Sequence, residues 1–268
     1  MRKSWAIGLL GLTLAAGCRL WTPPAAPPPM PTDNTLTLDE LVITSDFSLP
    51  SQHRLLEEIR MLRSDVSQTF RMTPSKEPIQ VYLFGTEDKF KQFMKVHYPT
   101  FPDRRAFFVE SDTRLMVYAY WGDRMAEDLR HEVSHGYMHS IVRNMPLWLD
   151  EGLAKYFEVP RGTHGLNWPL VEQLLSALNE GQWQPDLRRL EALNDPATMT
   201  QMDYAESWAW VHLLLETEPA RRAVLQGYLA DLRKDGSAAP LSVQIRQVNI
   251  APQRTLIEYL HGLAAAHH

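Results

Sequence analysis

The chain has 268 residues, of which 44% are hydrophobic and 22% are charged, and its formal net charge is −5. These values are typical of a globular protein and exclude disordered and collagen-like classes. The acidic balance gives no indication of a nucleic-acid-binding surface. The single cysteine excludes an intramolecular disulfide framework and a metal site built from several thiolates.

The N-terminal residues have the layout of a signal peptide: a positive start, a short apolar run and small residues before Cys18. The segment "LAAGC" resembles a bacterial lipobox, although Ala15 stands where a larger aliphatic residue is usual. We expect residues 1–17 to be the signal peptide and Cys18 to be lipidated, so that acyl chains contact the membrane. With Arg19 next, the resemblance implies the bacterial outer membrane, or a periplasmic protein if Cys18 is not lipidated.

Residues 18–35 are expected to form a tether. They include the proline-dense segment "WTPPAAPPPMPT", which favours extended polyproline conformations over helix or strand. The remaining residues, 36–268, are predicted to form a single domain. We expect a sheet-containing part over 36–122 and a helical part over 123–268.

Strand and helix patterns alternate in the first part of this domain. The expected strands are "ELVITSDFS", "PIQVYLFG", "RAFFVES" and "RLMVYAYW", because they are rich in β-branched and aromatic residues. Helices are expected over 51–70 and 86–97, with Ser51 and Thr86 as N-caps. The residues "SDT" suit a hairpin turn between the last two strands.

From Arg124 onward the pattern is helical. One helix is expected to end at Asn144, and Pro146 suits the first turn of the next. Further amphipathic helices are expected in "LVEQLLSALNE", "YAESWAWVHLLLET" and "PQRTLIEYLHGLAA". The predicted fold class is α+β, with an N-terminal mixed β-sheet and helices followed by an all-helical half.

The segment "HEVSH" has the pattern H-E-x-x-H. His131 and His135 are four residues apart, so on a helix they share one face. Two imidazoles in that arrangement can bind one Zn²⁺. Glu132 flanks the pair, which suits a general base acting on zinc-bound water. The alternative is a helix with two ordinary histidines, so the third ligand decides between them.

Spacing restricts the third ligand. Metzincins need a glycine and a histidine where this chain has Met138 and Ile141, which excludes that class. His139 continues the i+4 series, but a straight helix carries it past a metal held by the first two histidines. We expect it to support the ligands or to lie at the surface. Glu151 is the better candidate, because the chain turns back after Asn144 and presents it from the next helix.

The stretch "PLWLDEGLA", Pro146 to Ala154, resembles the gluzincin metallopeptidases, in which a glutamate on the helix after H-E-x-x-H completes the zinc site. It is most similar to small bacterial peptidase-MA-like proteins with P-x-W-L-x-E-G-L-A. The resemblance implies a thermolysin-like catalytic domain and a zinc site of His131, His135 and Glu151. Outside residues 128–157 the similarity is diffuse.

Three features of this stretch need explanation. Fifteen residues separate His135 from Glu151, fewer than in large aminopeptidases, so the connecting loop must be tight. Lys155 stands where thermolysin-like relatives have an aspartate that supports a zinc-bound histidine, so Asp150 or a backbone carbonyl must accept that hydrogen bond. Gly152 within a helix costs about 1 kcal/mol relative to alanine, which indicates a close approach of another helix or of the metal site.

The resemblance implies peptide-bond hydrolysis with Tyr204 stabilising the oxyanion, because a tyrosine on a later helix does so in this family. The alternative is that Tyr204 is a core residue, and Tyr137, His139 and His212 are weaker candidates for the role. Gluzincins bind extended substrates along an exposed sheet edge. We expect "RLMVYAYW" to be that edge, with an internal strand as the alternative.

Three functions remain open at this stage. The first is a zinc-dependent peptidase of the bacterial cell envelope, which the intact Glu132 favours. The second is a catalytically inactive, zinc-containing lipoprotein that binds a peptide or protein. The third is a zinc-stabilised structural lipoprotein, which the lack of cysteines in the body disfavours. We see no acidic cluster that would anchor a free amine, so an endopeptidase is favoured over an aminopeptidase. The sequence specifies neither substrate nor oligomeric state.

Overall fold

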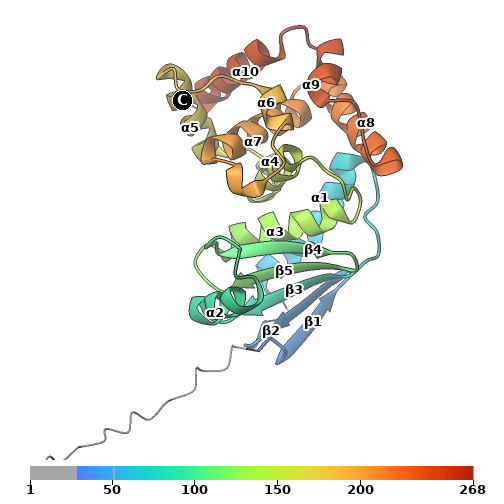
Figure 1. Cartoon of the computed structure of the whole chain (residues 1–268), viewed down its shortest axis with the longest axis vertical. Coiled ribbons are helices and arrows are strands. Elements are labelled where there is room, and N and C mark those ends of the chain that lie inside the picture. Colours follow the sequence, from blue (N-terminus) through green and yellow to red (C-terminus); the bar gives the residue numbers. More distant parts are fainter. Residues whose placement is uncertain (1–28, 51, 268) are drawn as a thin grey trace, which may run out of the picture.

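The structure is a computed structural model that describes residues 29–50 and 52–267. The predicted signal peptide and Cys18 lie outside the described residues. Within them the fold is α+β, with a five-stranded mixed sheet and ten α-helices. Figure 1 shows the sheet in one half of the molecule and a group of helices in the other. None of the described helices combines the length and hydropathy that a membrane span requires.

The sheet has the strand order β1-β2-β3-β5-β4. The strands are β1 (Asn34–Leu38), β2 (Leu41–Ser45), β3 (Ile79–Phe84), β4 (Ala106–Ser111) and β5 (Arg114–Tyr120). Strands β2, β3 and β5 are parallel, while β1 and β4 pair antiparallel at the two edges. The predicted hairpin at "SDT" is confirmed, because Ser111 pairs with Arg114. Strand β1 was not expected and begins within the predicted tether.

The prediction that "RLMVYAYW" forms an exposed edge is wrong. Strand β5 lies between β3 and β4, and β4 is the edge strand beside it. Side chains on both faces of β5 are buried, including Val117 on one face and Tyr118 on the other. A strand that is apolar on both faces is typical of the interior of a covered sheet.

Helices cover both faces of the sheet. Helices α1 (Arg54–Phe70) and α3 (Met125–His139) pack with one face, and α2 (Glu87–His97) packs with the other. Thr86 caps α2 as predicted, accepting a hydrogen bond from the backbone of Lys89. Helix α1 begins later than expected, and its N-cap is His53 in place of the predicted Ser51.

The C-terminal half is helical, as predicted. Its main helices are α4 (Leu147–Phe157), α5 (Trp168–Asn179), α6 (Leu187–Glu191), α7 (Gln201–Glu216), α8 (Pro219–Asp235), α9 (Leu241–Gln244) and α10 (Pro252–His267). Helix α3 ends at His139, five residues before the predicted Asn144. Ile141 and Val142 are buried in the turn that follows, where both backbone amides donate to the carbonyl of Met138. This tight turn directs α4 back alongside α3.

Helix α4 lies between α3 and the buried helix α7. A Cβ atom on Gly152 would lie 2.6 Å from the backbone oxygen of Ser207 in α7, so only glycine permits this approach. The expected close contact at Gly152 is therefore confirmed, and its partner is a helix. Buried Arg130 of α3 donates to the backbone oxygen of Glu158 at 2.6 Å and to Glu58 of α1 at 3.1 Å. The first contact fixes the end of α4 relative to α3, and the second joins α3 to α1.

Candidate metal centre

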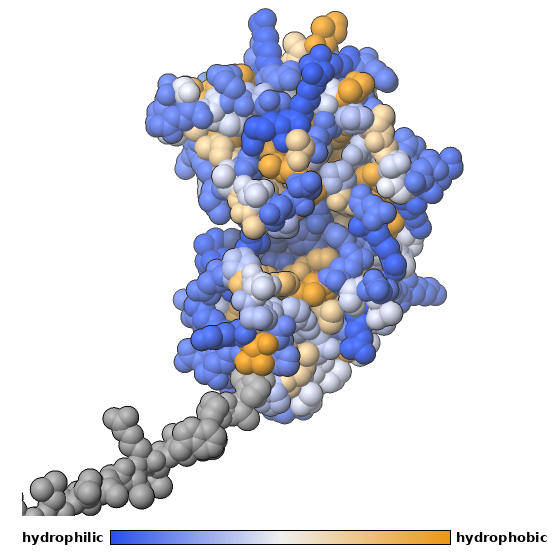
Figure 2. Space-filling view, in the orientation of Figure 1, coloured by the Kyte–Doolittle hydropathy of each residue, from blue (hydrophilic) through white to orange (hydrophobic). Residues whose placement is uncertain are grey.

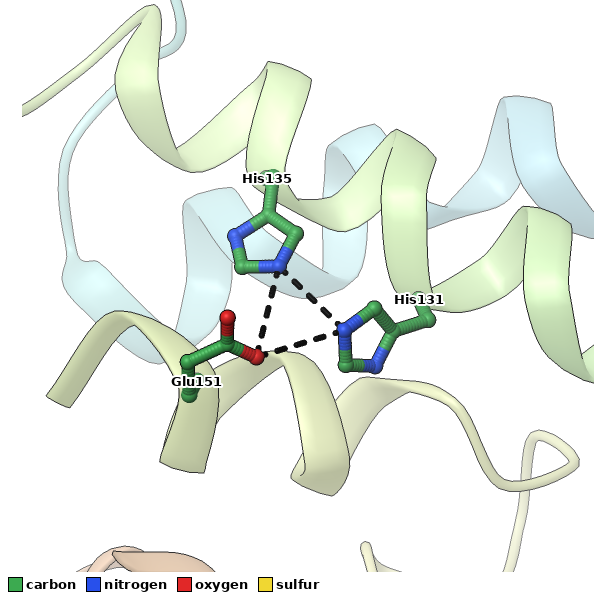
Figure 3. Close-up of side chains that lie close together, drawn as sticks. All are labelled: His131, His135 and Glu151. Carbon is green, nitrogen blue, oxygen red and sulfur yellow. Dashed lines mark hydrogen bonds and ion pairs between the residues drawn. The ribbon is translucent and has the colours of Figure 1, made fainter. Parts of the chain in front are cut away.

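Three predicted metal ligands lie together between α3 and α4. Figure 3 shows His131 and His135 projecting from α3 toward Glu151 of α4. The two Nε2 atoms are 3.3 Å apart. Oε2 of Glu151 is 3.4 Å from Nε2 of His131 and 3.9 Å from Nε2 of His135. The side chains are almost completely buried, and the three atoms face the space between them.

The residues fit a metal ion. Two ligands bound at about 2.0–2.1 Å in tetrahedral geometry are separated by about 3.3–3.4 Å, which matches two of the three distances. The third is longer by about 0.5 Å. Oε2 of Glu151 is buried and has no hydrogen-bond partner among the described residues. A buried polar oxygen without a partner is costly, and a cation would satisfy it. The described groups can therefore hold a metal ion.

Asp150 fixes the orientation of His135. Nδ1 of His135 lies 2.9 Å from Oδ1 of Asp150. An ionised carboxylate can only accept, so Nδ1 carries the proton and Nε2 presents its lone pair to the site. The other oxygen of Asp150, Oδ2, lies 3.1 Å from Nε2 of His139. Nδ1 of His139 in turn lies 2.5 Å from Oε2 of Glu110 on β4. His139 therefore supports Asp150, and its ring lies tilted against Phe108 of the edge strand, while the ring of His135 stacks on the same Phe108.

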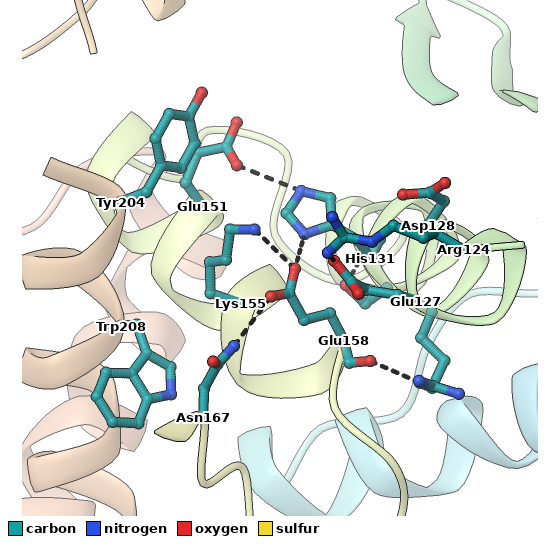
Figure 4. A network of polar contacts seen from close by, with 12 residues as sticks. Arg124, Glu127, Asp128, His131, Glu151, Lys155, Glu158, Asn167, Tyr204 and Trp208 are labelled. Carbon is teal, nitrogen blue, oxygen red and sulfur yellow. Dashed lines mark hydrogen bonds and ion pairs between the residues drawn. The ribbon is translucent and has the colours of Figure 1, made fainter. Parts of the chain in front are cut away.

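Glu158 fixes His131 in the same way, and sequence reasoning did not find it. Figure 4 shows its carboxylate contacting His131, Lys155 and Asn167. The corresponding distances are 3.0 Å from Nδ1 of His131, 2.8 Å from Nζ of Lys155 and 3.0 Å from Nδ2 of Asn167. Lys155 stands at the position where the resemblance implies a supporting aspartate. Here Glu158 supports His131 in its place, and Lys155 contacts the Glu158 carboxylate. A signal existed, because Glu158 follows Glu151 by seven residues, two helical turns along the same face.

The converging carboxylates favour positive charge at the site. Burial lowers the pKa of His131, but the neighbouring Glu151 and Glu158 more than offset this and raise it to about 10. Burial likewise raises the pKa of Asp150, yet His135 and His139 hold it well below its usual range. A metal ion binds the neutral imidazole of His131, so metal binding releases a proton and weakens at low pH.

Glu132 lies beside this space, next to the edge strand. Burial raises the pKa of its carboxyl group, and the two neighbouring histidines oppose that rise. The backbone of Phe108 forms a hydrogen bond to the carboxylate. Because backbone groups alternate in direction along an antiparallel strand, those of Ala106 and Glu110 also point away from β5. The free edge of β4 and the carboxylate of Glu132 therefore border the same region.

Tyr204, at the start of α7, lies close enough to Glu151 and Glu132 for their charges to act on its pKa, which burial also raises. Its hydroxyl oxygen accepts a hydrogen bond of 3.0 Å from Nη2 of Arg104. A guanidinium group has no acceptor, so the phenol proton remains free to be donated elsewhere. The weaker candidates Tyr137 and His212 are buried, only 1% and 3% exposed, and His212 contacts Tyr259 at 2.7 Å. Neither one lines the cavity beside the metal centre.

A cavity of about 460 Å³ opens beside the metal centre. It is lined by residues of both halves of the molecule, among them Arg104, His131, Glu132, Glu158 and Tyr204. Figure 2 shows that the surface is hollowed between these halves. A substrate in this cavity could reach the candidate ligands, the carboxylate of Glu132 and the hydroxyl of Tyr204 together.

Comparison with known proteins adds no assignment to this geometry. No protein-family model matches the chain, and no curated protein is significantly similar to it.

Proposed function

We propose that this protein is a zinc-dependent peptidase with a gluzincin-type, thermolysin-like catalytic domain. One observation carries the proposal: the buried oxygen of Glu151 faces the Nε2 atoms of His131 and His135, while Glu132 lies next to them. The donor set of two imidazoles and one carboxylate is that of hydrolytic zinc sites, which keep a position open for water. A structural zinc site would have four protein ligands.

The chain's own residues account for the remaining chemistry. A bound zinc ion polarises the substrate carbonyl and makes a water molecule more acidic. Glu132 accepts a proton from that water and passes it to the leaving amine, and its raised pKa suits both transfers. Tyr204 donates its free proton to the developing oxyanion. Asp150 and Glu158 keep the two histidines in the required tautomers.

The substrate we propose is an extended peptide that pairs with β4. This strand is the free edge beside Glu132, so its outward backbone groups can add a peptide as a further strand. No acidic cluster for a free amine was found in the sequence, so we favour an endopeptidase over an aminopeptidase. We also propose that the enzyme acts in the bacterial cell envelope, anchored by acyl chains on Cys18 or free in the periplasm.

The proposal is tested by measuring zinc content and cleavage of casein and a peptide library by the full chain. We expect about one zinc ion per chain. Glu132→Gln should lower cleavage by at least about 100-fold while zinc stays bound. The matched control is Glu172→Gln, an exposed glutamate on α5, which should leave both unchanged. A zinc-loaded wild-type chain that cleaves nothing would contradict hydrolysis and favour the inactive peptide-binding lipoprotein.

A further inference from the structure

Arg104 differs from the other basic side chains of the cavity. Five lysine and arginine residues line it, and four of them form ion pairs with carboxylates. The pairs are Lys91 with Glu87 and Asp103, Arg105 with Asp128, Arg124 with Glu127, and Lys155 with Glu158. No described carboxylate forms an ion pair with Arg104. Its polar partner is the neutral hydroxyl of Tyr204.

The guanidinium group of Arg104 has unused capacity for an anion. It offers five N–H donors in a planar fork, and the hydrogen bond to Tyr204 accounts for one of them. Carboxylates match this fork with two parallel hydrogen bonds. Arg104 is also exposed, so a ligand in the cavity can reach it. Glu132 and Glu151 act on its charge from a distance but belong to the metal centre.

The position of Arg104 relative to β4 indicates which part of a peptide would meet it. Arg104 lies in the loop before Ala106, the first residue of this strand. A peptide paired antiparallel with β4 runs from the Ser111 end toward the Ala106 end. The residues that follow the scissile bond would therefore approach Arg104.

We propose that Arg104 binds a carboxylate of the substrate on the C-terminal side of the scissile bond. The carboxylate is either the C-terminus of a short peptide or the side chain of an aspartate or glutamate. This inference rests on the proposed peptidase function and specifies its substrates as acidic on that side. The hydrogen bond to Tyr204 places the bound carboxylate next to the group that we propose stabilises the oxyanion.

The test uses pairs of fluorogenic peptides built on a sequence that the zinc-loaded wild type cleaves. One series compares a C-terminal carboxylate with a C-terminal amide, and another compares Glu with Gln one or two residues after the scissile bond. In one series or the other, the acidic member should have a kcat/KM about tenfold to hundredfold higher, the range expected for a hydrogen bond to a charged group. The series that shows the preference identifies the source of the carboxylate.

Arg104→Gln should reduce this preference to about onefold, and Arg104→Lys should retain part of it. The matched control is Arg246→Gln, which removes an exposed positive charge from the short 3-10 helix after α9 (Ile245–Gln247) and should keep the full preference. A wild type without acidic preference in either series would overturn the inference. So would a preference that survives in Arg104→Gln.

Binding separates this inference from the proposed function. Peptides from the library, each made as acidic and neutral pairs of the two kinds described above, are titrated by fluorescence anisotropy into the zinc-loaded Glu132→Gln chain, whether or not the wild type cleaves them. If the wild type hydrolyses nothing but acidic peptides bind more tightly, and Arg104→Gln removes the difference, the peptidase proposal fails and the carboxylate site stands. Equal binding of acidic and amide peptides overturns the carboxylate site.

Discussion

Replacing Glu158 with glutamine should weaken zinc binding without removing a metal ligand. The carboxylate is 7% exposed and accepts from three donors. Its Oε2 contacts His131 and Lys155, and its Oε1 contacts Asn167. Glutamine has a single acceptor oxygen, so it cannot accept from His131 and Lys155 on one side and also from Asn167 on the other. The substitution also leaves the largely buried ammonium group of Lys155 without a compensating charge.

Removing such a supporting carboxylate typically lowers metal affinity by about 10- to 100-fold, or about 1.4–2.7 kcal/mol. The assay is competition for zinc between the full chain and a chromophoric chelator at neutral pH. Glu172→Gln serves as the control, because Glu172 is exposed on α5 and distant from His131 in sequence. A Kd for zinc equal to that of the wild type would refute the role of Glu158, provided that the variant melts at a similar temperature.

Two further predictions concern stability. Gly152→Ala should lower the free energy of unfolding by about 1–3 kcal/mol, because the added Cβ meets the backbone of Ser207. Gly227→Ala, in open space within α8, should raise it by about 1 kcal/mol. Equal shifts of the two variants in thermal unfolding would contradict the close contact at Gly152. Burial lowers the pKa of His212 to about 4, so between pH 6.5 and 4 only the unfolded chain takes up this proton. Stability should therefore fall as the pH falls through that window, by up to about 3 kcal/mol, and denaturant titrations of His212→Gln should lack this part of the pH dependence.

Local patterns were sufficient for much of the fold. The α+β class, the β4–β5 hairpin and the cap at Thr86 followed from signals within a few residues of each other. The position of Gly152 also indicated a close contact before its partner was known. The choice of β5 as the sheet edge failed because strand order depends on contacts between distant segments. The unbroken apolar pattern of β5 in fact favours an interior strand.

The sequence alone determined which side chains could form the metal centre. The spacing of His131 and His135 acts within one helical turn, and it needs no knowledge of the rest of the chain. Only the tertiary structure decided that Glu158, 27 residues from His131, supports that histidine, and that Arg104, 100 residues from Tyr204, contacts its hydroxyl. Such contacts depend on how whole helices and loops pack against one another. The spacing of Glu158 from Glu151 indicates that the two share a helix face, but only the packing of α3 against that face brings Glu158 to His131.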